Sequence, residues 1–90
     1  MKSYRCIVKG KVHGGNFQGW VQTEAERLGL TGWVRNVRDR EAEILIQGEA
    51  EKIATFRELL KTKAPLPEVE KITCNAITHD KSFDSFEMRG

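Results

Sequence analysis

The stretch YRCIVKGKVHGGNFQGWVQTEAERL, residues 4–28, decides the fold because the spacing of its apolar residues changes partway along. From Tyr4 to Val12, apolar and basic side chains alternate, which is the period of a strand with one buried face. From Phe17 to Leu28, apolar residues recur every three or four positions, which is the period of an amphipathic helix. The segment therefore predicts a strand that runs through a short glycine-rich turn into a helix.

The rest of the chain repeats these two patterns. Strand-like stretches recur at residues 31–37, 42–47, 69–77 and 83–88, and helical spacing recurs at residues 50–60. The order is β-α-β-β-α-β, with the last strand region in one or two pieces, and it matches the split β-α-β motif. We predict an α+β fold, a ferredoxin-like sandwich in which an antiparallel sheet carries two helices on one face, because that arrangement hides both helical apolar stripes.

Length and composition set limits on the class of protein. Ninety residues correspond to one domain, which we expect to span residues 1–90. The net charge is +2, and basic and acidic residues are interleaved along the chain, so we expect no nucleic-acid partner. The sequence shows neither a signal peptide nor an apolar run of membrane-spanning length, so we expect a cytoplasmic protein without a membrane partner. With near-balanced charge, a monomer is the expected state.

The two cysteines, Cys6 and Cys74, fall inside strand-like segments. A disulfide framework in a short chain usually has four or more cysteines, so we expect two reduced, buried thiols. His13 and His79 are remote from each other in sequence and have no partners at metal-ligand spacing. We therefore expect no metal and no cofactor.

The junction between the first strand and the first helix is the most informative place for function. Gly10, Gly14 and Gly15 lie within six residues, just before a helix. Such a loop can present free backbone N–H groups to an anion at the positive end of the helix, or it can be an ordinary tight turn. Asn36, near the end of a central strand, is either a turn-forming residue or an amide that positions water or substrate.

Two segments carry a resemblance to a known family. Residues 10–18, Gly-Lys-Val-His-Gly-Gly-Asn-Phe-Gln, resemble the acylphosphatase signature Gly-x-Val-Gln-Gly-Val-x-Phe-Arg. Residues 28–36, Leu-Gly-Leu-Thr-Gly-Trp-Val-Arg-Asn, closely match that family's second signature, Leu-Gly-Leu-x-Gly-Trp-Val-x-Asn. The ending Phe86-Glu87-Met88-Arg89 resembles the family's terminal Phe-x-Ile-Arg, so the match spans roughly residues 4 to 89.

The resemblance implies hydrolysis of acyl phosphates to a carboxylate and inorganic phosphate, without a metal, a cofactor or a covalent intermediate. It implies that Asn36 holds the attacking water, and that the substrate or inorganic phosphate or sulfate binds a backbone cradle. The cradle residues are Lys11, Val12, His13, Gly14, Gly15 and Asn16.

One residue departs from the family's pattern. The family's phosphate-gripping arginine aligns with Gln18, and a neutral amide lacks the charged fork of a guanidinium. We expect weakened activity. The alternative is a catalytically disabled member that acts as an anion-binding domain.

Other cations near the cradle are poor substitutes by position. We expect the side chain of Lys11 to point to solvent and that of Arg35 to lie on the opposite face of its strand from Asn36. Arg38 lies past the end of the strand pattern, so the sequence does not predict the direction of its side chain. Trp20 and Trp33 are expected to be core or partly covered residues instead of a base-stacking platform.

Overall fold

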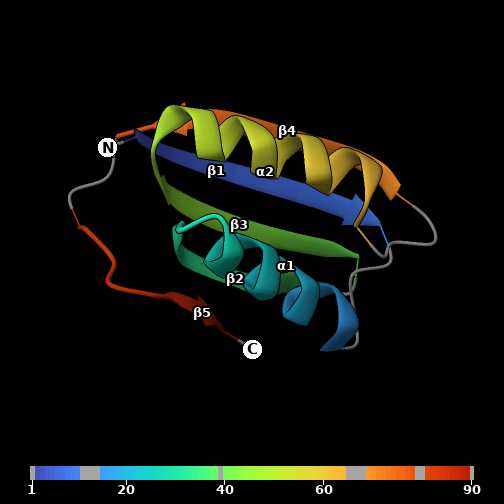
Figure 1. Cartoon of the computed structure of the whole chain (residues 1–90). Helices are drawn as coiled ribbons and strands as arrows, with labels where there is room; N and C mark the ends of the chain where they lie inside the picture. The colour runs from blue at the N-terminus through green and yellow to red at the C-terminus, as the bar shows by residue number, and fades with distance from the viewer. Residues whose placement is uncertain (1, 11–14, 39, 65–68, 79–80, 90) are drawn as a thin grey trace.

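The computed structural model describes residues 2–10, 15–38, 40–64, 69–78 and 81–89 (Figure 1). Its elements are β1 (Lys2–Gly10), α1 (Gly15–Arg27), β2 (Thr31–Arg38), β3 (Glu41–Gly48), α2 (Ala50–Thr62), β4 (Val69–Ile77) and β5 (Phe86–Met88). This order confirms the predicted β-α-β-β-α-β pattern, with the last strand region in two pieces.

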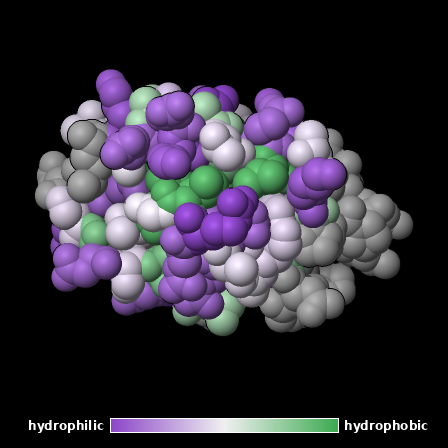
Figure 2. Space-filling model, in the orientation of Figure 1, coloured by the Kyte–Doolittle hydropathy of each residue, from purple (hydrophilic) through white to green (hydrophobic). Residues whose placement is uncertain are grey.

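The strands form one sheet in the order β4-β1-β3-β2-β5, and both helices lie against the same face of it (Figure 1). Figure 2 views the helix-covered side, where hydrophilic side chains surround an apolar strip that lies between the helices. Neither helix in the described ranges has the length and apolar content needed to cross a bilayer. The ferredoxin-like α+β sandwich is therefore confirmed.

The direction of β5 is the one departure from the predicted antiparallel sheet. The pairs β1–β3, β1–β4 and β2–β3 are antiparallel, whereas β5 runs parallel to β2. The cause is topological. Strand β4 ends at the same end of the sheet at which β2 begins (Figure 1). The chain crosses the sheet at that end and then continues beside β2, so β5 must run in the same direction as β2.

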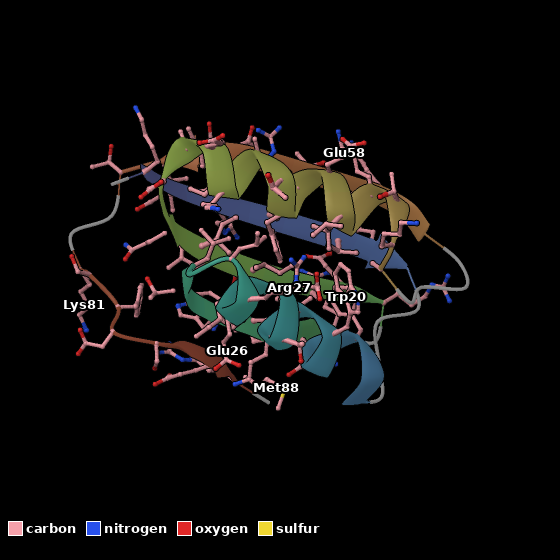
Figure 3. All side chains as sticks on the ribbon, in the orientation of Figure 1. Trp20, Glu26, Arg27, Glu58, Lys81 and Met88 are labelled. Atoms are coloured by element: carbon pink, nitrogen blue, oxygen red, sulfur yellow. A yellow bond between two sulfur atoms is a disulfide. The ribbon has the colours of Figure 1, made fainter. Side chains whose placement is uncertain are left out.

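The core lies between the sheet and the helices. The inward residues of β1 include Cys6 and Val8, as the alternation predicts, and α1 contributes Phe17, Val21 and Ala25. Trp20 packs against this cluster without being fully buried (Figure 3). After Arg27, Gly29 adopts a φ of 72°, which confirms the left-handed helix end that its position predicts.

Strand β3 is buried on both faces, unlike the other strands. Ala42, Ile44 and Ile46 face the helices, but Glu43, Leu45 and Gln47 are also buried, on the side of the sheet that has no helix. We call that side the open face. A carboxylate and an amide buried there need partners, because an unsatisfied buried polar group costs about 1–3 kcal/mol.

Glu43 takes its partners from the two neighbouring strands. The Nε atom of Arg5 on β1 donates to one carboxylate oxygen, and Nε and an Nη atom of Arg35 on β2 lie 2.9 and 2.7 Å from the other. The Glu43 side chain is 6% exposed, while the two arginine side chains are about half exposed. The carboxylate thus links β1, β3 and β2 across the open face.

Gln47 holds the segment that crosses the end of the sheet between β4 and β5. Its Nε2 atom donates to the carbonyl oxygen of Lys81 at 2.6 Å and to Oγ of Ser3 at 3.2 Å. Its Oε1 atom accepts from the backbone N–H of Phe83 at 3.1 Å. Figure 3 shows Lys81 on this crossing segment, which the Gln47 amide ties to β3.

Gly32 allows β2 and β3 to approach closely. A Cβ atom at this position would lie 1.9 Å from the carbonyl oxygen of Leu45, and the φ of Gly32 is 135°. No other residue fits this backbone without strain. The glycine of the Thr-Gly-Trp segment is therefore required by the pairing of the sheet.

The expectation of two reduced thiols is wrong. Cys6 and Cys74 form a disulfide between β1 and β4. They are direct partners in the antiparallel ladder, with Cα atoms 4.0 Å apart, although 68 residues separate them in sequence. The number of cysteines alone does not predict this disulfide. The pairing of the two strands predicts it, because both cysteines lie at inward positions directly opposite each other.

The buried Glu43 predicts a pH-dependent contribution to stability. Burial raises the pKa of its carboxyl, but hydrogen bonds and charges from Arg5 and Arg35 outweigh burial and hold the pKa below its ordinary value. A lowered folded-state pKa stabilises the fold above the unfolded-state pKa, and this contribution disappears as pH falls through the folded-state value. We expect Glu43→Gln to reduce the free energy of unfolding by about 1–2 kcal/mol at pH 7.

Urea unfolding at neutral and strongly acidic pH checks this. The difference between the parent protein and Glu43→Gln should shrink at acidic pH, where the parent carboxyl is also protonated. Glu41→Gln, a half-buried carboxylate on the same strand, is the matched control and should cost less. A Glu43→Gln deficit that stays constant with pH would exclude the charge pairing as its source.

Candidate functional site

Four chain segments meet at one end of the strands of the sheet, and we call this end the sheet edge. Strand β1 ends at Gly10, whose backbone N–H donates to the carbonyl oxygen of Arg40 at 2.9 Å, just before β3 begins. Because β2 is antiparallel to β3, it ends at this same edge, and α1 begins here too (Figure 1). The topology thus brings Gly10, Gly15 and Asn36 to one end of the molecule.

The first turn of α1 supplies free backbone donors at this edge. The helix begins at Gly15, two residues before the predicted start, so Gly15 and Asn16 belong to its first turn. The first four N–H groups, counted from the residue just before the helix, have no partner within the helix, which adds that of Phe17 to the predicted donors. This first turn contains no acidic residue that would repel an anion. Lys11, Val12, His13 and Gly14, also predicted for the cradle, lie outside the described residues.

Gln18 lies on the buried side of α1. It is 8% exposed and shares the inward stripe of the helix with Val21 and Ala25, at spacings of three and seven residues. Phe17, its neighbour, is 2% exposed and fixes the start of the helix in the core. The structure therefore has a shielded neutral amide at the position that aligns with the arginine.

Asn36 projects from β2 on the helix-covered face, the same face as Val34. Its backbone pairs with Ala42, and the ladder shifts register between Asn36 and Arg38, so Asn36 occupies the last regular pair. Its side-chain Oδ1 atom is shielded from solvent and has no hydrogen-bond partner among the residues that the structure describes. A shielded acceptor without a partner is rare in folded proteins and can accept a hydrogen bond from a bound water or ligand.

The two arginines that flank Asn36 do not share its face. Arg35 is bound to Glu43 on the open face, as the alternation of strand residues predicts. The register shift pairs Arg38 with Glu41, so Arg38 also belongs to the open face. Neither Arg35 nor Arg38 therefore replaces the arginine that the family pattern has at the position of Gln18. In the ranges that the structure describes, no three His, Cys, Asp or Glu side chains are grouped to hold a metal ion.

Comparisons with known proteins show the family and the fold of the chain. The family model described as acylphosphatase matches residues 4–88. An acylphosphatase from Bacillus subtilis is 37% identical over 84 residues, which cover 93% of this chain and 89% of that protein. The crystal structure of acylphosphatase from Bacillus subtilis covers 100% of both chains, with a TM-score of 0.90 and 33% identity. An acylphosphatase structure from Coxiella burnetii has a TM-score of 0.86 and 30% identity, and the match covers 98% and 92% of the two chains.

Proposed function

The chain belongs to the acylphosphatase family, and we propose that it hydrolyses acyl phosphates at the sheet edge where β1, β2 and α1 meet. The observation that carries this proposal is the shielded, unpartnered Oδ1 atom of Asn36 at the same edge as the first turn of α1. The reaction gives a carboxylate and inorganic phosphate.

In this proposal, the phosphoryl group binds backbone N–H groups of residues 11–16, joined by that of Phe17. The positive end of α1 and the absence of acids in its first turn favour a bound anion. Because the acyl group is a good leaving group, the protein mainly positions the reactants and stabilises charge.

Asn36 binds the attacking water in this mechanism. Its Oδ1 atom accepts a hydrogen bond from the water, and this leaves the oxygen lone pairs directed at phosphorus. The carboxylate leaves as the water oxygen bonds to phosphorus, and the water protons pass to the phosphate and the solvent. The backbone around Asn36 is fixed by its pairing with Ala42 and by the Arg35–Glu43 ion pair on the opposite face.

Gln18 favours a weaker enzyme. A guanidinium gives two charge-assisted bonds to phosphate, whereas an amide gives neutral ones. This same residue supports the alternative function, an anion-binding domain that retains the cradle but turns over substrate poorly. The hydrolysis rate of the parent protein beside Gln18→Arg separates these functions, and the other two experiments below test the cradle and Asn36.

Phosphate should stabilise the protein under either function, because a ligand that binds only the folded state raises its stability. If the dissociation constant is about 10 mM, 50 mM phosphate adds about 1 kcal/mol, which corresponds to a few degrees in Tm for a chain of this length. Thermal unfolding in phosphate, with chloride at equal ionic strength as the control, measures this. A Tm that phosphate leaves unchanged would argue against the cradle.

Gln18→Arg should raise the hydrolysis rate of a simple aromatic acyl phosphate by about 10²- to 10³-fold, because it restores a charged contact made in the transition state. The rate is measured beside the parent protein and the spontaneous reaction. Thr23→Arg adds the same charge at an exposed site of α1 and should leave the rate unchanged. If the parent already hydrolyses the substrate well above background, Gln18 is tolerated and the disabled alternative is excluded.

Asn36→Ala in the Gln18→Arg background should remove most of the restored activity, by about 10²-fold or more, by analogy with the loss of one positioned hydrogen-bonding group. Stability should stay or rise, because Oδ1 has no hydrogen bond to lose within the described residues and its burial is itself unfavourable. The neighbouring Val37→Ala, at a 43% exposed side chain, is the control and should keep the activity. Full activity in the Asn36→Ala double variant would show that water is positioned by another group.

A further inference from the structure

The open face collects basic side chains that are dispersed along the sequence. Strand residues two apart share a face, so charges that alternate with apolar residues end on one side. Six exposed basic residues of the described chain lie on this face: Arg5, Lys9, Arg35, Arg38, Lys71 and Arg89.

Acidic residues on this face are fewer than basic residues and less exposed to solvent. Glu43 is buried beneath its two arginines and Glu41 is half-buried, so Glu87 is the exposed carboxylate among the side chains that the structure describes on this face. These nine residues carry a formal charge of +3, whereas the whole chain carries +2. Exposed carboxylates such as Glu26 and Glu58 belong to the helices, on the opposite side (Figure 3). The open face therefore has a positive charge that the overall composition conceals.

One pair on this face opposes the stability of the sheet. Lys9 on β1 and Lys71 on β4 are direct cross-strand partners, and both are exposed. Like charges directly opposite each other destabilise an antiparallel pair. Glu41, which lies opposite Lys9 on β3, offsets part of this repulsion, and an anion bound over β1 and β4 would relieve the rest.

The same face carries an indole ring next to the positive charges. Trp33 is half-buried on β2, and the guanidinium carbons of Arg35 and Arg89 lie 5.0 and 5.4 Å from its ring centroid. The side chains of Arg35 and Arg89 remain about half exposed. Guanidinium groups and indole rings are the groups on which unpaired bases stack.

We propose that the open face binds single-stranded nucleic acid, with phosphates along Lys71, Lys9 and the arginines and with bases against the Trp33 cluster of Trp33, Arg35 and Arg89. The positive charge of the open face favours a polyanion as the partner. The Trp33 cluster favours a polyanion whose bases are unpaired and can stack on it. An anionic membrane fits less well, because Val37 is the only large apolar side chain exposed on this face in the described ranges. This departs from the expectation of no nucleic-acid partner, which rested on the order of charges along the chain. It is independent of acyl-phosphate hydrolysis at the sheet edge.

Fluorescence anisotropy with a labelled oligothymidylate of about 15 nucleotides tests this surface at low salt and across a salt series. We expect saturable binding that weakens with salt and exceeds binding to a duplex of equal length, to anionic vesicles and to polyglutamate. Equal or tighter binding of any of these three would overturn the proposal, as would the lack of oligothymidylate binding at low salt.

Lys71→Glu and Lys61→Glu are a matched pair, because both lysines are exposed and both variants lower the net charge by two. Lys71→Glu should weaken oligothymidylate binding by about tenfold and reduce the salt slope by about one. Its Tm should stay or rise, because the new carboxylate lies opposite Lys9. Lys61→Glu, on α2, should change binding less than twofold. Equal weakening by both variants would show that net charge alone causes the binding.

Discussion

The residues of β3 from Ala42 to Gln47 are buried on both faces, although the strand carries a carboxylate and an amide on the side without helices. Burial of these groups is tolerated only because neighbouring strands supply their partners. Glu43 binds Arg5 and Arg35, and Gln47 binds Ser3 and the segment at Lys81 and Phe83. A slip of one residue would move every one of these groups to the helix side and expose the apolar set. Polar pairing on the open face and apolar packing beneath the helices therefore specify the same register.

The proposed site depends on this register. The last regular pair between β2 and β3 holds Asn36, and the extra residue that follows turns Arg38 toward the face of Glu41. At the other side of β3, the hydrogen bond from Gly10 to Arg40 fixes the end of β1. The site edge is thus defined by strand pairing, and α1 adds its free N–H groups because Phe17 anchors its first turn in the core.

Local periodicity predicted the elements well, because alternation and helical spacing record which side of each element is buried. The burial of Glu43 could not be predicted in this way, since its partners Arg5 and Arg35 come from different strands and are 38 and 8 residues distant. The Cys6–Cys74 disulfide and the Lys9–Lys71 pair were missed for the same reason, because both arise across β1 and β4. Motif resemblance indicated Asn36 and Gln18, but only the structure gives their burial and the missing partner of Oδ1.

Asn36 and Gln18, the two polar side chains at the sheet edge, have different consequences for the stability of the fold. An unpaired buried acceptor such as Oδ1 of Asn36 costs about 1–3 kcal/mol, and an apolar residue at that position would avoid the cost without disturbing the ladder. Asn36 is therefore a poor choice for stability alone and fits a residue that binds water. Gln18 imposes no comparable demand, because replacing a buried guanidinium by an amide lowers the desolvation cost at the start of α1. Stability thus accounts for Gln18 but not for Asn36, and this contrast supports the proposal that Asn36 binds water and that Gln18 makes a weaker contact with phosphate than an arginine would.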